Sequence, residues 1–386
     1  LKIAGTPFGI FYSAGAAWRI SNEAFLRAFS SLEELKMRFS YGRVGNDNIG
    51  ESTATNYYRI VKFRQTTGLY PALVPNDELS YEMISRMNGG IDLSLLGNRI
   101  STNIDLYRSV TDNLLVFVPL DAYFGYDFRP ENSGKMENKG LDFHLFLRVI
   151  NRPRFNWDIE GWYSLNRNKI LEIKGDKHVS DVVGGEIVNQ VGEKANSFYG
   201  YIFKGVYAAS QEAREAGLVN KRMVPYQAGD AIYEDLSGPG GEPDGIINDF
   251  DKTIIGSSMP DHFGGISNRI TYGRWTLRAF FQYVSGNELF NYIRYQNENM
   301  IGLENQSKKV LARWQFEGQE TEIPRAVFDD PVGNTAFSTR WIEDGSYIRL
   351  KNLTLYYTVP EGFLNLRNAQ VYVSACNLVT LHNYLG

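Results

Sequence analysis

The sequence predicts an all-β chain whose antiparallel strands run up and down as part of a transmembrane barrel. Residues 341–360 form one long strand pattern in which apolar and polar side chains alternate, so that strand has one apolar and one polar face. The predicted connections alternate between tight turns and long segments, as in outer-membrane barrels. Aromatic residues make up 14% of the chain, which suits the aromatic girdles of such barrels.

The strand within residues 341–360 also predicts a local irregularity. Leu353 and Leu355 lie on one parity, whereas Ile348 and Leu350 lie on the other. A regular strand would point these two pairs to opposite faces. The sequence therefore predicts either a β-bulge or a change of environment along this strand. Residues 347–359 are long enough to cross a bilayer when tilted.

Amphipathic strands are predicted along most of the chain, at residues 9–18, 34–44, 89–96, 99–108, 138–150, 154–166, 264–272, 275–284, 345–359 and 368–379. Residues 20–33 break the pattern, because Phe25, Leu26, Phe29 and Leu32 have the spacing of a short amphipathic helix.

The clearest alternation lies in residues 138–150 and 154–166. It predicts that the apolar members face lipid, namely Leu141, Leu145, Leu147, Trp157 and Ile159. The polar members are predicted to face the barrel lumen, namely Asp142, His144, Asp158 and Glu160.

Two kinds of connection join these strands. Tight turns are predicted at Gly97 with Asn98, at residues 151–153, and at Gly273 with Arg274. Long segments are predicted at residues 45–88, 109–137, 167–263 and 285–344. Short turns at one end and long loops at the other are typical of an outer-membrane barrel.

Composition and motifs exclude several other classes. No run of about 18 apolar residues exists, so helical membrane spans are excluded. The single cysteine, Cys376, excludes an internal disulfide, and the net charge of −4 gives no basic surface for nucleic acid. The four histidines have no metal-binding spacing, and no nucleophile elbow or nucleotide-binding loop is present. We therefore expect no catalytic residue.

One loop has the order of oxygen ligands that a calcium ion needs. An EF-hand-like loop places ligands at positions 1, 3, 5, 7 and 12, with glycine at position 6. If residues 239–243 are treated as an insertion, the ligand set is Asp235, Ser237, Asp244, the Ile246 carbonyl and Asp251, with Gly245 at the turn. The alternative is a solvated acidic loop without a metal.

Two further segments suggest binding or charge pairing. Residues 283–299 are rich in Asn and Tyr, which can stack on and hydrogen-bond a sugar or a peptide backbone but are equally common in polar loops. Arg340, Glu343 and Asp344 precede the long strand and predict a charge cluster whose role is structural pairing.

Six segments, in order along the chain, resemble the SusC/RagA-type TonB-dependent transporters. They are SYGRVGN (residues 40–46), ENKGLDF (137–143), YGYIFKGVY (199–207), IIGSSMPDHFGGISN (254–268), WIEDGSYIRLKNLTLYYTVP (341–360) and VYVSACNLVTL (371–381). The resemblance implies that residues 1–386 are the C-terminal portion of a barrel of roughly 22 strands in the bacterial outer membrane, with the plug domain and the final strand absent.

The same resemblance implies import of an oligosaccharide or peptide together with a SusD-like surface lipoprotein. Energy would come from TonB through the plug region. Outer-membrane lipid is the other implied partner. A secreted all-β protein that binds or cleaves glycans is the alternative, since it would share the aromatic content and the Asn-rich loops. Such a sandwich would not sort its loops by length onto two ends.

Overall fold

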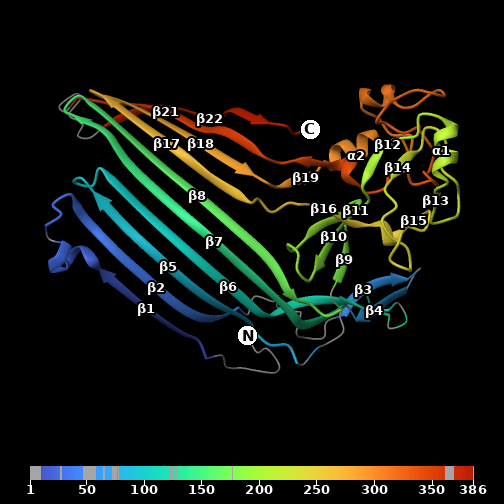
Figure 1. Cartoon of the computed structure of the whole chain (residues 1–386), viewed down its shortest axis with the longest axis horizontal. Helices are drawn as coiled ribbons and strands as arrows, with labels where there is room; N and C mark the ends of the chain where they lie inside the picture. Colours follow the sequence, from blue (N-terminus) through green and yellow to red (C-terminus); the bar gives the residue numbers. More distant parts are fainter. Residues whose placement is uncertain are drawn as a thin grey trace.

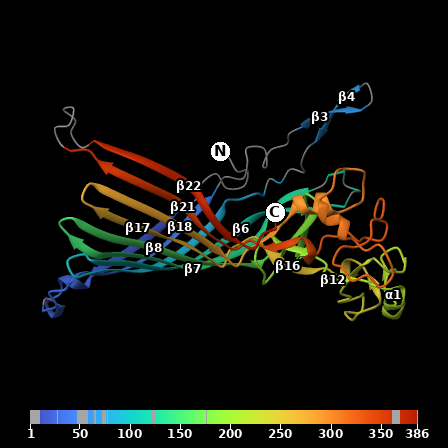
Figure 2. The ribbon, with the colours of Figure 1, turned by 90° about the horizontal axis from the view of Figure 1, so that it is seen from above.

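The computed structural model describes residues 10–26, 28–46, 58–63, 66–71, 76, 78–121, 123, 125–126, 128–175, 177–360 and 369–385. Its main feature is one ten-stranded antiparallel sheet in which the strands follow chain order (Figures 1 and 2). The strands are β1 (Tyr12–Arg19), β2 (Leu32–Asn46), β5 (Glu82–Leu95), β6 (Ile100–Pro119), β7 (Phe128–Arg152), β8 (Phe155–Glu172), β17 (His262–Tyr272), β18 (Trp275–Ser285), β21 (Tyr347–Thr358) and β22 (Gln370–His382).

All the predicted sheet strands are present, and the fold is the predicted up-and-down antiparallel arrangement. Among the described residues β1 pairs only with β2, and β22 pairs only with β21, so the sheet does not close on itself. The alternative of a soluble sandwich requires two packed sheets of comparable size. A single ten-stranded up-and-down sheet with its long connections at one end contradicts that alternative.

Two local predictions were wrong. Residues 109–137 are not one long loop, because β6 continues to Pro119 and β7 starts at Phe128, with Leu115 opposite Asn132. Backbone hydrogen bonding between two adjacent strands does not need an apolar face, so the hairpin extends beyond the amphipathic part. Residues 20–33 contain two short 3-10 turns, η1 (Ile20–Asn22) and η2 (Ala24–Leu26), where the spacing had suggested a helix. A helix this short gains too few hydrogen bonds to offset nucleation.

Cross-strand pairing gives the sheet an apolar and a polar face. Directly paired residues of antiparallel strands point to the same side. One row across the sheet is apolar or aromatic apart from one glycine: Trp18, Met37, Ile91, Ile104, Phe143, Tyr163, Gly264, Tyr283, Ile348 and Leu381. The adjacent row is mainly polar: Arg19, Lys36, Asp92, Asn103, His144, Trp162, Gly265, Gln282, Arg349 and Thr380. We call the sides that carry these rows the apolar face and the polar face.

The predicted grouping of side chains in β7 and β8 is confirmed. Leu147 pairs with Ile159 on the apolar face, and Arg148 pairs with Asp158 on the polar face. The predicted bulge in β21 is confirmed as well. Register shifts on both sides of the strand leave Lys351 unpaired, so Leu350 and Leu353 lie on the same face.

The long connections of the later strands fold into a separate layer beyond one end of the sheet (Figure 1). We call residues 173–261 and 286–346 the loop layer. Its strands are β9 (Lys177–Val182), β10 (Gly185–Gln190), β11 (Ser197–Gly200), β12 (Phe203–Val206), β13 (Val219–Asn220), β14 (Ala231–Tyr233), β15 (Ile246–Ile247), β16 (Thr253–Ser257), β19 (Glu288–Phe290) and β20 (Ile342–Asp344). Its helices are α1 (Ser210–Ala216), η4 (Asp249–Asp251), α2 (Tyr292–Glu298), η5 (Lys308–Ala312) and η6 (Thr339–Trp341). A further hairpin, β3 (Tyr58–Phe63) with β4 (Thr66–Pro71), stands apart.

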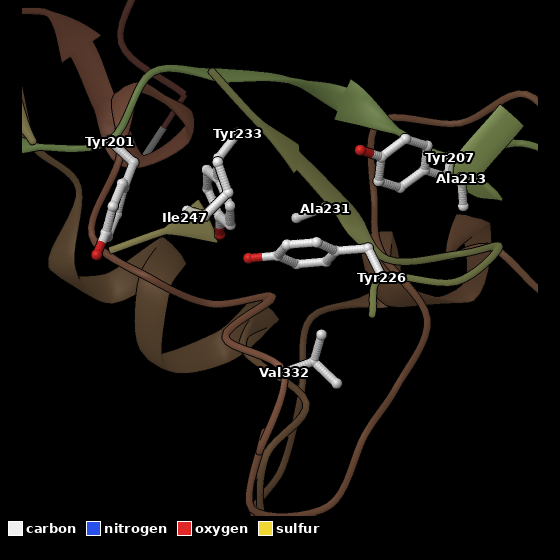
Figure 3. Close-up of a cluster of buried hydrophobic side chains, with 8 residues drawn as sticks. All are labelled: Tyr201, Tyr207, Ala213, Tyr226, Ala231, Tyr233, Ile247 and Val332. Atoms are coloured by element: carbon white, nitrogen blue, oxygen red, sulfur yellow. The ribbon is translucent and has the colours of Figure 1, made fainter. Parts of the chain in front are cut away.

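A buried hydrophobic cluster lies within the loop layer. Figure 3 shows its members: Tyr201, Tyr207, Ala213, Tyr226, Ala231, Tyr233, Ile247 and Val332. Tyr233 is also held by its hydroxyl, which donates a hydrogen bond to the Gly333 carbonyl at 2.9 Å. Residues from both long connections therefore share one core. In the described part of the chain, no helix combines the length and apolar character that crossing a membrane requires.

Candidate functional site

The polar face carries a network of charged side chains across β2, β5 and β6. The Arg38 guanidinium donates two hydrogen bonds to Asp92, at 2.9 and 2.8 Å, and one to Asp105 at 3.0 Å. Lys36 lies 3.4 Å from the same Asp92 carboxylate. Paired strands bring Arg38 to carboxylates that lie 54 and 67 positions away in the chain.

A glycine makes room for this network. Gly90 lies between Arg38 and Asp105 in the sheet register. A Cβ atom at Gly90 would lie 2.5 Å from Asp105 Oδ1 and 2.8 Å from Arg38 Nη2. Any side chain there would force the ion pairs apart. Glycine is therefore required at position 90, because the Arg38 and Asp105 side chains approach the backbone closely there. The pattern of charges in the sequence did not reveal this requirement.

The charged network continues onto β7 and β8. His144 Nε2 lies 3.0 Å from Glu160 Oε1, and Arg148 donates to Asp158 at 3.1 Å. All four residues remain partly exposed. The polar face is therefore an accessible surface with many hydrogen-bond donors and acceptors. It suits a polar solute, but its donors and acceptors do not converge on one ligand position.

The loop layer contains a cavity of about 400 Å³. Its lining combines aromatic and charged side chains. The aromatic ones are Tyr201, Tyr226, Tyr233 and Phe337, and the charged ones include Glu186 and Lys252. The figure of the buried cluster shows three of these tyrosines, with the Tyr226 ring directed toward Tyr233 (Figure 3). Lys221 and Arg222 add two exposed cations to the cavity lining.

Charge pairing fixes Lys252 in this cavity. Its ammonium lies 2.6 Å from Glu186 and 2.8 Å from Asp249. Burial lowers the pKa of Lys252, but the hydrogen bonds to Asp249 and Glu186 outweigh burial and raise its pKa overall. Burial also raises the pKa of Tyr201 to about 12. Both groups are therefore in their ordinary protonation states at neutral pH.

The predicted calcium ligands are divided between two hydrogen-bonded units. Asp235 accepts hydrogen bonds from the backbone N–H groups of Asp244 (3.4 Å) and Gly245 (2.7 Å). Asp251 is fully buried and accepts from Leu236 and Ser237 through one carboxylate oxygen, and from Asn248 through the other. Asp244 accepts from the N–H of Ile246 at 2.9 Å.

These hydrogen bonds explain the acidic residues without a metal. Over the described residues, no group of three or more His, Cys, Asp or Glu side chains is arranged to hold a metal ion. Calcium binding by Asp235, Ser237, Asp244, Ile246 and Asp251 remains a prediction.

The Asn- and Tyr-rich segment is used for structure. Asn291 is fully buried and caps α2 by accepting from the Arg294 N–H at 2.9 Å. Its amide also donates to Glu343 at 3.0 Å. Arg294, which the sequence analysis missed, donates to both Glu298 and Glu343 at 3.1 Å. This segment therefore joins α2 to β20 within the second long connection.

The predicted cluster of Arg340, Glu343 and Asp344 is only partly formed. Arg294 Nη1 bridges the Arg340 carbonyl at 3.0 Å and the Glu343 carboxylate at 3.1 Å. The Arg340 guanidinium lies over the Trp341 ring at 4.3 Å, and burial lowers the pKa of Arg340 to about 10. Asp344 instead accepts from Ser346.

The chain is similar to known receptors along nearly its whole length. The family model described as TonB dependent receptor-like, beta-barrel matches residues 4–378. TonB-dependent receptor P3 of Formosa agariphila is 31% identical over 98% of this chain and 38% of its own length. TonB-dependent receptor SusC of Bacteroides thetaiotaomicron is 27% identical over 95% of this chain and 35% of its own.

A solved structure has the same fold. The structure of the RagAB peptide transporter matches with a TM-score of 0.78 and 26% identity, over 97% of this chain and 40% of that chain. The chain spans less than two-fifths of the length of the curated relatives it matches. The sheet is amphipathic and runs up and down, and its long connections lie at one end. These features agree with the matches, and the chain therefore belongs to the TonB-dependent receptor β-barrel family of the outer membrane, of the SusC and RagA type.

Proposed function

We propose that this chain is the C-terminal barrel portion of an outer-membrane transporter that imports a glycan or peptide nutrient. The observation that carries the proposal is the continuous polar face, which runs over ten strands and ends at a loop layer containing an aromatic cavity. In a closed barrel such a face lines an aqueous interior, while the apolar face contacts lipid.

Relatives support the class of cargo. SusC is similar to this chain in sequence, and RagAB, which is similar in structure, is a peptide transporter. Tyrosine rings beside charged groups can stack on sugars or on peptide bonds and hydrogen-bond their polar groups. The proposal includes a SusD-like lipoprotein that covers the loop layer and TonB acting through a plug region. It assigns no catalytic role to any residue.

Uptake by the full-length transporter tests the proposal. A strain lacking the gene should lose growth on one glycan or peptide source, and complementation should restore growth only when TonB is functional. Mass spectrometry of the complex purified from native membranes should identify the ligand and a co-purifying lipoprotein. Growth on every tested nutrient without the gene, together with a purified protein free of ligand and lipoprotein, would contradict the proposal.

Lys221 and Arg222, the two exposed cations of the cavity, allow an experiment that distinguishes a peptide cargo from a glycan cargo. A peptide carries a terminal carboxylate, whereas a neutral glycan carries none. The double variant Lys221→Ala/Arg222→Ala should weaken peptide uptake roughly tenfold or more, since charge-assisted hydrogen bonds each contribute about 1.5 to 3 kcal/mol. Uptake of a neutral glycan should be unchanged. The variant Lys308→Ala/Lys309→Ala removes the same charge from η5, away from the cavity lining, and is the matched control.

A further inference from the structure

A cluster of basic side chains lies on the apolar face, where three adjacent strands change character at the same level. Leu106, Leu141 and Leu165 form one cross-strand row on β6, β7 and β8. The next row on the same face, toward the long connections, is Arg108, Lys139 and Arg167. On each of the three strands, the next residue on this face after the leucine is therefore a lysine or an arginine.

Lys169 adds a fourth cation to this cluster. It pairs in the register with Glu137, which is buried and is the acidic residue at the centre. Arg108 lies 2.5 Å from Glu137, and Lys139 lies 3.8 Å from it. Arg167 and Lys169 are exposed and form no ion pair within the part of the chain that the structure describes. The cluster therefore retains a positive charge that the protein does not neutralise.

The position of the cluster matches the edge of the hydrocarbon layer. On β7 the apolar face carries Leu141, Phe143, Leu145, Leu147 and Ile150 in sequence. These residues span roughly 30 Å of strand, which at a tilt of about 40° covers the ~25 Å apolar band of such barrels. Lys139 comes immediately beyond this band. It lies on the side of the long connections, which in these barrels is the extracellular side.

A hollow in the apolar face opens directly beside the cations. The groove has a volume of about 680 Å³, and its lining includes Phe39, Met87, Leu106, Leu165, Arg108 and Arg167. Gly89 lies at its floor, between Phe39 and Leu106 in the register. A Cβ at Gly89 would meet no atom within 4 Å, so the missing side chain creates the hollow.

We propose that this groove binds the phosphorylated glycolipid of the outer leaflet, lipid A. Its acyl chain would lie in the hollow over Gly89, and its phosphate would contact Arg108, Lys139 and Arg167. Arginine and lysine at this level can reach the phosphate layer while their alkyl stems cover apolar surface. The neighbouring leucine row, which includes Leu165, continues to His262 on β17 and Ser285 on β18, so these two strands add no lysine or arginine at this level.

Native mass spectrometry of the full-length transporter in detergent tests this proposal. Wild type should retain lipid A that carries its phosphates and should bind dephosphorylated lipid A at least tenfold more weakly. The double variant Lys139→Gln/Arg167→Gln should lose at least tenfold in affinity for phosphorylated lipid A. Arg152→Gln/Arg274→Gln removes the same charge at the short-turn end and should leave binding unchanged.

Further experiments distinguish lipid A from other ligands that carry a phosphate. Gly89→Leu keeps every charge but fills the hollow, and it should weaken lipid A severalfold while the thermal stability stays near wild type. Inorganic phosphate at millimolar concentration and phosphatidylglycerol should compete poorly, because neither matches both the cations and the groove. Equal retention of phosphorylated lipid A by wild type and Lys139→Gln/Arg167→Gln would overturn the proposal. Equal losses in the patch variant and the short-turn control would also overturn it.

Discussion

Asp230 and Arg325 join the two long connections of the loop layer through a bidentate ion pair. Asp230 is fully buried, and the Arg325 guanidinium reaches it across 95 residues of chain with contacts of 2.7 and 3.2 Å. Asn334 and the Gln227 N–H also donate to the same carboxylate. Every oxygen of this buried carboxylate is thereby bonded, which is the condition under which a buried charge is tolerated.

Asp230→Ala should therefore destabilise the loop layer strongly. Removing one partner of a buried ion pair leaves its donors unpaired and typically costs about 3 kcal/mol or more. Limited proteolysis of the full-length transporter should show faster cleavage within residues 173–261 and 286–346. Glu234→Ala is the matched control, because Glu234 pairs with Lys204 at the surface and such pairs contribute about 1 kcal/mol or less. Equal protease sensitivity in both variants would contradict the assigned role of Asp230.

Leu145 and Asp142 should face opposite environments in the membrane. The cross-strand register places Leu145 on the apolar face with Gly161, and Asp142 on the polar face with Ser164. A water-soluble thiol reagent should label Asp142→Cys and leave Leu145→Cys unlabelled, with Cys376 replaced beforehand. Leu145→Arg should cost about 2 to 4 kcal/mol if the site lies near the bilayer midplane. Strong labelling at Leu145→Cys alone would reverse the assignment of the two faces.

The loop from Asp235 to Asp251 is the place to look for calcium. If calcium binds there, titration calorimetry on the full-length transporter should show uptake that Asp244→Ala abolishes, since Asp244 supplies a central carboxylate of the predicted ligand set. Glu242→Ala removes a carboxylate of the same loop outside that set and should leave calcium uptake intact. Absence of any heat above the buffer blank in wild type would reject the calcium prediction. The hydrogen bonds described above would then be the whole role of these carboxylates.

Alkaline pH should loosen the loop layer through its buried tyrosines. Burial raises the pKa of Tyr201 to about 12, and burial raises the pKa values of Tyr226 and Tyr233 in the same direction. In the unfolded chain tyrosine loses its proton near pH 10, so the unfolded state binds fewer protons than the folded state above that pH. Stability should be unaffected below about pH 9 and should fall between roughly pH 10 and 12.

Each such tyrosine contributes a slope of about 1.4 kcal/mol per pH unit in that window. Tyr201→Phe should therefore reduce the pH dependence of unfolding between pH 10 and 12. Proteolysis rates measured across that range provide the readout. Tyr272→Phe, at an exposed position at the end of β17, should leave the slope unchanged. A slope that Tyr201→Phe does not alter would show that Tyr201 titrates as a solvent-exposed group.

The sequence by itself determined the strands and their two faces. A period of two is a local property, so Leu141 to Leu147 and the parity change at Leu350 could be read without any partner strand. The tight turns at Gly97 with Asn98 and at Gly273 with Arg274 were equally local, because their conformations depend on a few residues. These turns predict the neighbours β5 with β6 and β17 with β18, since short turns join adjacent antiparallel strands.

Only the tertiary structure decided how residues distant in the chain meet. The pairing of Asp230 with Arg325, the space that Gly90 leaves for Arg38, and the hollow over Gly89 depend on register and on side chains from other strands. No periodic pattern encodes these contacts. The acidic loop shows the same limit, because the spacing of Asp235, Asp244 and Asp251 is equally compatible with calcium ligation and with the backbone hydrogen bonds these carboxylates accept.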